Sequence, residues 1–360
     1  MAENSEISWT THTANFWTGC VKVSDPGLCT NCYALSITNR FGGDFERDRT
    51  MVKKVWNDIP RWQKLSEQTG VRPRVFVMSM GDFFEALPET HKDYYELCEA
   101  RRRAVVLMEE TTGIDYLVLT KRISNVKKMV PARWLQSWPS HVRLGISVGT
   151  QPDADRDIPR LLQIPCPNFV SMEPLLECVS IRNFLHIAWQ CSGCQSYFSG
   201  RYQKVCPTCG REDYWTGSHR FNRGMQQVGP GLQWAITGGE SGPQARPSHP
   251  DWFRLLRDEC LQAETPFHLK QWGEWIGGKF DRAKGKMVCQ SSQEDQPVGR
   301  IFWTNPGEPK VHLWDAADRY WTHASARVGK HAAGRLLDGQ LWDQFPCVPA
   351  IASVPAEAAR

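Results

Sequence analysis

Short apolar runs alternate with longer amphipathic or charged segments over most of this sequence. Runs that are nearly continuous and rich in Val and Ile are typical of parallel strands that are buried on both faces. We therefore expect strands over Arg74–Met80, Asp115–Thr120, Arg143–Val148, Asn168–Met172 and Gln233–Thr237, with a weaker sixth pattern over Pro266–Gln271.

The segments between these runs predict helices, one over about Thr90–Thr111, one after Ser124 and one over about Asp251–Ala263. Ser248, Pro250 and Asp251 supply signals for the start of the last helix. Alternating strands and helices indicate an α/β fold, a full or partial (β/α) barrel.

Polar or charged residues follow successive strand runs. In a parallel barrel, the carboxyl ends of the strands form the active-site face. Every strand must end in a polar loop, so one such residue carries little weight, but their recurrence favours a functional site. These residues are Asp82, Lys121, Arg122, Glu173, Glu240 and, within the last run, Lys270.

Two stretches break the α/β rhythm. Residues 189–229 suggest an inserted module, and residues 277–327 are irregular, polar and without a predicted element. We therefore expect the first part of the barrel over 1–188, the module over 189–229, the rest of the barrel with an irregular extension over 230–345, and a frayed tail over 346–360.

The first cysteine cluster has the pattern C-x8-C-x2-C, formed by Cys20, Cys29 and Cys32. Three thiolates can hold three irons of a [4Fe–4S] cluster and leave the fourth iron open to the amino and carboxylate groups of S-adenosylmethionine (SAM). Asp25, Pro26 and Gly27 provide the turn chemistry that such a loop needs. The alternatives are a structural zinc site with a fourth ligand such as His12, or three ordinary buried cysteines.

The chain resembles a phage-associated, radical-SAM-like family, the phage three-Cys-motif proteins. The chain departs from the common radical SAM pattern in two ways. The spacer between the first two cysteines is longer, and Asn31 stands before Cys32 in place of an aromatic residue, with Tyr33 after it. The matching stretches are Ile7–Cys20, Cys29–Ala34, Ser79–Phe84, Leu119–Arg122, Leu144–Val148, Ser171–Leu175, Gly238–Pro247, Lys270–Trp275 and Gly329–Gly339.

The resemblance implies a barrel of the radical SAM type and a set of SAM-binding residues. Ser79, Gly81 and Asp82 occupy the place that receives the SAM amino group in radical SAM enzymes. Later strand ends in those enzymes contact the carboxylate and ribose, which implies roles for Lys121, Arg122, Ser147 and Glu173.

Gly238, Gly239 and Glu240 follow a predicted strand, where glycine would permit close backbone approach to a ligand. The alternative is a plain turn between a strand and a helix.

The second cysteine cluster has the pattern C-x2-C-x11-C-x2-C, formed by Cys191, Cys194, Cys206 and Cys209. Two such pairs close a tetrahedral site, which predicts a structural zinc ribbon, although a rubredoxin-like iron site uses the same ligands.

Basic and aromatic residues surround this cluster, and together they suit phosphate contact and base stacking. The alternative is a stapled loop that orders a lid over the barrel mouth. The surrounding residues are Arg201, Tyr202, Lys204, Arg211, Tyr214, Trp215, His219, Arg220, Phe221 and Arg223.

Composition limits the classes further. The 43 Lys and Arg against 39 Asp and Glu give a net charge of +4, which permits nucleic-acid binding without requiring it. No apolar run approaches the ~20 residues that span a bilayer, and residues 1–10 contain no apolar signal region, so we expect a cytoplasmic protein without membrane contact. In that compartment 13 cysteines do not indicate disulfides.

Neither a phosphate-binding loop, an H-E-x-x-H motif nor a Ser-His-Asp order appears in the sequence, so hydrolase functions have no residues to support them. Six further cysteines have no partners at motif spacing, and we expect ordinary thiols, although radical SAM enzymes sometimes use one as a hydrogen donor. These are Cys98, Cys166, Cys178, Cys260, Cys289 and Cys347.

The leading hypothesis is a radical SAM enzyme in which an electron from a flavodoxin- or ferredoxin-like donor leads to a 5′-deoxyadenosyl radical. Its substrate would be a nucleic-acid base, as in phage-linked DNA or RNA modification, or a small metabolite. The resemblance also implies a three-Cys-motif partner protein. The alternatives are a non-catalytic nucleic-acid-binding protein with two structural metals, and a nucleic-acid repair lyase that recycles SAM.

Overall fold

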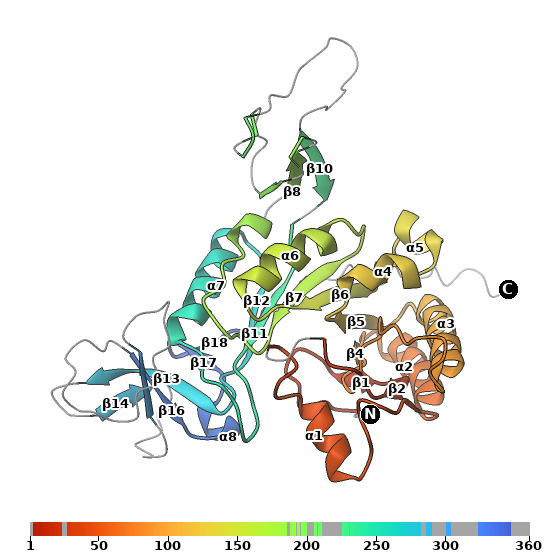
Figure 1. Ribbon diagram of the computed structural model, residues 1–360, viewed down its shortest axis with the longest axis horizontal. Coiled ribbons are helices and arrows are strands. Elements are labelled where there is room, and N and C mark those ends of the chain that lie inside the picture. Colours follow the sequence, from red (N-terminus) through yellow and green to blue (C-terminus); the bar gives the residue numbers. More distant parts are fainter. Residues whose placement is uncertain are drawn as a thin grey trace.

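The computed structural model describes residues 3–23, 27–185, 188–191, 193–194, 196–199, 205–206, 208–210, 225–229, 231–281, 286–289, 300–303 and 323–346. Its centre is a seven-stranded parallel sheet curved into a half-barrel, with the strand order β1-β4-β5-β6-β7-β11-β12 (Figure 1). The strands are β1 (His12–Ala14), β4 (Arg74–Val77), β5 (Asp115–Thr120), β6 (Val142–Ser147), β7 (Asn168–Met172), β11 (Ala235–Gly238) and β12 (Phe267–Gln271).

The predicted α/β alternation is confirmed, and the barrel is partial rather than full. β5 and β7 have the bounds that the sequence predicts, and the other four predicted strands shift by a few residues. The run at Arg74–Met80 ends early, because Met78 turns the chain with φ 64° while its N–H bonds to Ala14 O at 2.8 Å. The sequence analysis missed β1, which is three residues long and largely polar.

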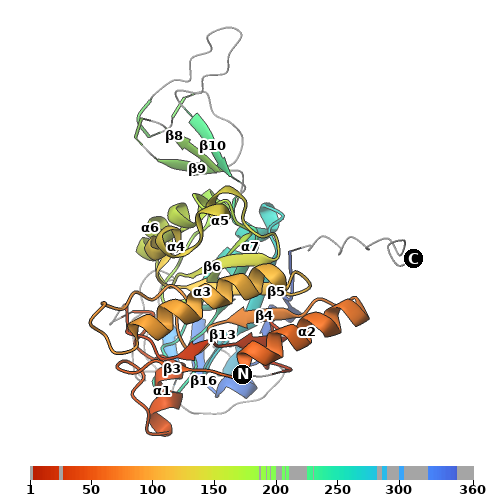
Figure 2. The same ribbon diagram turned by 90° about the vertical axis from the view of Figure 1, so that its right-hand side faces the viewer.

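Helices cover the outer face of this sheet (Figures 1 and 2). They are α2 (Val55–Thr69), α3 (Tyr94–Glu110), α4 (Ile123–Met129), α5 (Ala132–Gln136), α6 (Gln151–Leu162) and α7 (Pro250–Gln262). The predicted helix at Asp251 begins one residue earlier, and its N-cap is His249, whose Nδ1 accepts a hydrogen bond from Asp251 N at 3.1 Å. Ser248, one of the three predicted start signals, instead donates to Leu175 O at 2.7 Å.

Successive strand residues alternate between two cores, as the pleat of a strand requires. On β4, Val75 and Val77 pack in the large core under the helices, whereas Phe76 packs in a smaller cluster on the inner face. That inner cluster consists of Trp9, Phe76, Leu117, Phe169, Trp234 and Ile236.

Smaller elements surround the half-barrel. The short strands β2 (Trp17–Thr18) and β3 (Thr50–Met51) pair near the N-terminus, and α1 (Tyr33–Arg40) follows the first cysteine cluster. The short helix η1 (Arg182–Phe184) follows β7. Near the end of the described chain lie α8 (Lys330–Ala333), β17 (Leu336–Leu337) and β18 (Gln340–Leu341).

Two antiparallel sheets interrupt the parallel pattern. β10-β8-β9 contains β8 (Ala188–Cys191), β9 (Tyr197–Ser199) and β10 (Met225–Gly229), and it stands apart from the half-barrel in both views (Figures 1 and 2). The segment without a predicted element holds most of a four-stranded sheet, β14-β13-β16-β15. Its strands are β13 (Trp275–Asp281), β14 (Lys286–Cys289), β15 (Arg300–Trp303) and β16 (His323–Arg327).

Two further expectations concern the C-terminal tail and membrane-spanning helices. The tail expected over 346–360 lies outside the described residues from residue 347 onward. Within the described part of the chain, no helix combines the length and the apolar character needed to cross a bilayer.

Candidate functional site

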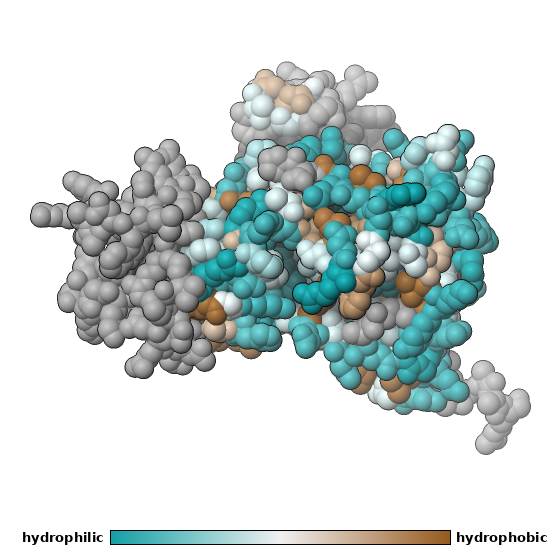
Figure 3. All heavy atoms as spheres, turned by 60° about the horizontal axis from the view of Figure 1, so that its bottom comes forward, coloured by the Kyte–Doolittle hydropathy of each residue, from teal (hydrophilic) through white to brown (hydrophobic). Residues whose placement is uncertain are grey.

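A cavity of about 430 Å³ lies at the carboxyl ends of the parallel strands. All three cysteines of the first cluster line it, so the structure places them beside the strand ends. The other predicted site residues that line it are Ser79, Gly81, Asp82, Lys121, Arg122, Ser147, Glu173, Gly239 and Glu240. Gly238 is the one predicted binding residue that is absent from the lining. Figure 3 shows the side of the molecule on which α1 lies, where polar residues cover most of the described surface.

The loop that carries the three cysteines is held to the half-barrel at its first end by a buried ion pair. Arg49 donates to both carboxylate oxygens of Glu85, at 2.6 and 2.8 Å. Glu85 Oε1 also accepts from Val21 N at 2.8 Å, and Arg122 Nη2 donates to Val21 O at 2.6 Å. Backbone groups next to Cys20 are therefore fixed by charged partners, which form stronger hydrogen bonds than neutral ones.

The other end of the loop is held by Glu240. Its Oε2 accepts from Asn31 Nδ2 at 2.9 Å, and both of its oxygens accept from the Arg246 guanidinium at 2.7 and 2.9 Å. Arg246 Nη2 in turn donates to Gly27 O at 2.8 Å. Glu240 thus positions the loop, and the unusual residue before Cys32 is one of its hydrogen-bond partners.

Asp82 joins the ends of two neighbouring strands. One carboxylate oxygen accepts from Phe84 N and Thr120 Oγ1, at 2.9 and 2.7 Å. The other accepts from Lys121 N and Arg122 Nη1, both at 3.0 Å. Since protein groups occupy both oxygens, the contacts of Asp82 describe a positioning residue that aims Arg122 at the cavity.

Arg122 is the cation nearest to Cys20, with Nη1 at 3.3 Å from Sγ. Burial raises the pKa of the Cys20 thiol to about 12, and the Arg122 charge opposes that rise. Burial lowers the pKa of Arg122, but the carboxylate of Asp82 and the sulfur of Cys20 outweigh it and leave the pKa raised. Arg122 therefore stays charged and reduces, without cancelling, the rise that burial causes in the pKa of Cys20.

Four further hydrogen bonds involve Ser79 and Glu173, which line the cavity. Ser79 Oγ accepts from Asn15 Nδ2 at 3.0 Å, and its carbonyl accepts from the hydroxyl of Tyr33. Farther along the sheet, Glu173 Oε1 accepts from Lys270 Nζ at 2.7 Å and from Gln271 Nε2 at 2.9 Å.

The glycine pair, at which the sequence predicts close approach of a ligand, also lies close to another part of the chain. A Cβ on Gly239 would lie 1.9 Å from Trp272 O, and a Cβ on Gly238 would lie 3.3 Å from Gln271 O. This close approach is between two parts of the chain, where β11 and β12 end side by side.

The alternative ligand His12 lies on β1, where its ring centroid is 4.6 Å from that of Trp62, and it does not line the cavity. A single Zn²⁺ with Zn–S bonds of ~2.3 Å holds its sulfurs about 3.8 Å apart. Cys20, Cys29 and Cys32 are not among the described groups whose ligand atoms all lie within 4.8 Å of one another. The described structure therefore does not bring these three sulfurs to the spacing of a single zinc ion.

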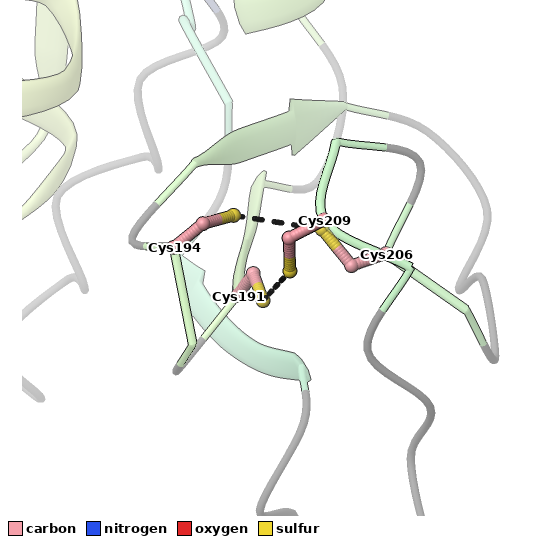
Figure 4. Close-up of side chains that lie close together, drawn as sticks. All are labelled: Cys191, Cys194, Cys206 and Cys209. Atoms are coloured by element: carbon pink, nitrogen blue, oxygen red, sulfur yellow. Dashed lines mark hydrogen bonds between the residues drawn. The ribbon is translucent and has the colours of Figure 1, made fainter.

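The second cysteine cluster does meet that spacing and could hold a metal ion. All four sulfurs lie within 4.8 Å of one another, with Cys191 3.7 Å from Cys209 and Cys194 3.7 Å from Cys206 (Figure 4). A hydrogen bond between Cys194 Sγ and Ser196 Oγ at 3.1 Å lowers the pKa of the Cys194 thiol to about 6, which favours the thiolate that a metal binds.

The place of this module does not fit a lid. Its last strand, β10, leads through residues 231–234 to the amino end of β11, the end opposite to the cavity, and no described residue of 188–229 lines the cavity. The basic and aromatic residues expected to contact nucleic acid, Arg201, Tyr202, Lys204, Arg211, Tyr214, Trp215, His219, Arg220, Phe221 and Arg223, lie outside the described residues. Asp25 and Pro26 of the predicted turn lie outside them as well.

Comparison with known proteins gives a family. Residues 4–346 match the model of a family described as "Protein of unknown function (DUF5131)". The chain belongs to this family. No curated protein and no solved structure matches it. DUF5131 membership thus covers both cysteine clusters and the half-barrel, and the radical-SAM-like and phage-associated character stays a prediction.

This DUF5131 chain does bring a serine, a histidine and an aspartate together, although no Ser-His-Asp motif is apparent in the sequence. Ser8 Oγ lies 2.8 Å from His268 Nε2, and His268 Nδ1 lies 3.6 Å from Asp343 Oδ1. However, Arg335 Nη2 lies 3.2 Å from the same Nε2. Burial, together with the Arg335 charge, lowers the pKa of His268 to about 3, so the imidazole is a poor base and the cluster is structural.

The remaining cysteines stay outside the cavity. Cys166 and Cys260 are buried, Cys98 is half-buried and Cys178 is exposed, and none of the four lines the cavity. The side chain of Cys289 and all of Cys347 lie outside the described residues. Sequence reasoning also missed the cavity residues Phe76, Ser171 and Gln271 on strands, and Trp9 in the turn before β1.

Proposed function

We propose that this chain is a radical SAM-type enzyme with a [4Fe–4S] cluster on Cys20, Cys29 and Cys32. The observation that carries the proposal is that three thiols from one loop line a cavity at the carboxyl ends of a parallel half-barrel. Among the described residues that line this cavity there is no fourth cysteine and no histidine. The donor set suits a cluster that keeps one iron open for SAM.

The bound cluster and SAM would supply the reductive cleavage that yields a 5′-deoxyadenosyl radical. The chain's own residues would hold and orient them. Glu85, Arg122 and Glu240 fix the loop, and Arg122 places a positive charge beside Cys20. The wall formed by the inner strand positions would exclude water from the reacting groups.

We further propose that Cys191, Cys194, Cys206 and Cys209 hold a structural zinc ion. The sulfur distances of 3.7 Å match the spacing of about 3.8 Å expected around tetrahedral zinc. A closed site of this kind stabilises a small module and leaves no position open for chemistry. The proposed partners are a flavodoxin- or ferredoxin-like electron donor and a three-Cys-motif protein.

The test is SAM cleavage by anaerobically reconstituted full-length protein with dithionite, with 5′-deoxyadenosine and methionine measured by mass spectrometry. We expect both products from the native chain and from Cys178→Ala, whose exposed thiol does not line the cavity. Cys29→Ala should yield neither. Native protein that holds zinc alone and leaves SAM intact would favour the non-catalytic two-metal protein instead. Recovery of SAM after turnover of a damaged nucleic acid would favour the repair lyase.

A further inference from the structure

The inner wall of the cavity carries two neighbouring hydroxyl groups. Ser147 on β6 and Ser171 on β7 are paired in register, and their side chains point to the inner face. They are 4% and 2% exposed, and both residues line the cavity. A buried polar group is costly unless it is hydrogen-bonded, so this part of the wall is suited to a ligand that forms hydrogen bonds with the two hydroxyl groups.

The floor of the cavity adds an aromatic surface and one further donor. Trp9 is 2% exposed, lines the cavity, and packs against Phe76 with ring centroids 4.6 Å apart. Its indole Nε1 has no hydrogen-bond partner within the described structure. Such a floor suits a flat ring that stacks and also offers an acceptor atom.

The charges change between the inner wall and the mouth. Inside, Lys270 and Glu173 form an ion pair at 2.7 Å, so the wall is polar but its charge is compensated. Among its more exposed residues, the lining includes Lys22, Lys121 and Lys330 against the carboxylate of Glu6. This gradient suits a ligand with an uncharged polar ring at one end and an anionic group at the other.

We propose that the inner half of the cavity binds the base of a nucleotide. The base lies on Trp9 and Phe76 and is read by Ser147 and Ser171, while its phosphate lies among the lysines of the mouth. The inference names the substrate class of the proposed enzyme and therefore rests on that function. SAM would occupy the part of the cavity next to the three thiols.

The experiment titrates anaerobically reconstituted full-length protein, saturated with SAM, by calorimetry. The probes are the common ribo- and deoxyribonucleoside 5′-monophosphates, the matching nucleosides without phosphate, and a short single-stranded oligonucleotide. We expect at least one monophosphate or the oligonucleotide to bind, and the bare nucleoside to bind more weakly. Binding of the monophosphate alone would indicate a free nucleotide, and binding of the oligonucleotide alone would indicate a nucleic acid; either supports the base site.

Two conservative variants locate the base. Trp9→Phe keeps the ring and removes the indole N–H, and Ser171→Ala removes one hydroxyl. Each should weaken nucleotide binding by about three- to tenfold, the effect of one lost hydrogen bond. Trp17→Phe is the matched control, since Trp17 is also fully buried with an unpartnered Nε1 in the described structure but does not line the cavity.

The outcomes separate this inference from the proposed function. If SAM is cleaved but no nucleotide binds, or if nucleotide and SAM compete for one site, the base site is overturned and the enzyme class stands. Equal binding by Trp9→Phe and native protein would also overturn it. If the protein holds no iron, nucleotide binding that weakens in Trp9→Phe and Ser171→Ala would still support the base site while the proposed function fails.

Discussion

The two cysteine-bearing regions differ in coordination and in place. The first offers three cysteines on a loop at the carboxyl ends of the sheet, all lining a cavity whose walls combine polar and aromatic residues. The second offers four thiols within 4.8 Å of one another in a small antiparallel module that stands apart from the sheet (Figures 1 and 4). An incomplete ligand set beside a cavity suits chemistry, whereas a complete set away from it suits stabilisation.

The contacts around the two cysteine clusters also differ. Ion pairs among Arg49, Glu85, Arg122 and Asp82 hold the first cluster, and three of these four side chains are buried. In the second cluster, short local hydrogen bonds such as that between Cys194 and Ser196 surround the sulfurs. Long-range contacts therefore orient the loop at the cavity, whereas local contacts surround the four sulfurs of the module, which could hold a metal ion.

The largest expected effect is on metal content, which should respond separately to substitutions in the two cysteine clusters. Cys29→Ala should remove essentially all iron and sulfide and leave about one zinc per chain. Cys206→Ala should remove the zinc and leave the iron, because the clusters lie on separate elements. Metal analysis of both variants checks this. Loss of both metals in either variant would contradict the separation of the two sites.

The next effect concerns the anchoring of the loop. Asp82→Asn keeps the shape of the side chain but leaves the mostly buried Arg122 short of a counter-charge, and should lower the free energy of unfolding by about 3 kcal/mol. Glu99→Gln is the control, because its pair with Arg102 is exposed and should contribute less than about 1 kcal/mol. Denaturant unfolding measures both, and equal losses would show that Asp82 is no special anchor.

An effect on stability that is small at any one pH but accumulates as the pH falls comes from His268 on β12. The pKa of His268 is lowered to about 3 in the folded chain, against 6.5 in the unfolded chain. As pH falls between these values only the unfolded chain takes up the proton, so the free energy of unfolding falls by up to about 1.4 kcal/mol per pH unit. His268→Gln should show a shallower fall between pH 6.5 and 4. An unchanged slope would mean that His268 is not buried as a neutral ring.

Continuous apolar runs made most of the half-barrel predictable. β5 and β7 are six and five residues of such runs, and their burial on both faces leaves little ambiguity. β1 could not be found this way, because His12–Ala14 contributes only three residues and pairs with β4 far along the chain. The antiparallel sheet of β13 to β16 was missed because its strands are interspersed with polar and glycine-containing segments.

The sequence predicts the site residues that directly follow a strand. It does not predict the site residues whose side chains lie on the inner face of the sheet. Asp82, Arg122 and Glu173 follow strand runs and could be identified from position alone. Ser171 becomes visible only once strand register places it on the inner face, and Trp9 only once its turn packs against Phe76 there. The anchoring role of Glu240 depends on Asn31, which lies more than two hundred residues away in sequence.

The most direct test of the central claim is electron paramagnetic resonance of anaerobically purified, dithionite-reduced protein, with and without SAM, alongside counts of iron, sulfide and zinc. The account predicts about four irons and four sulfides per chain and a reduced-cluster signal that changes when SAM is added. Zinc without iron, or a cluster signal that SAM leaves unchanged, would contradict it.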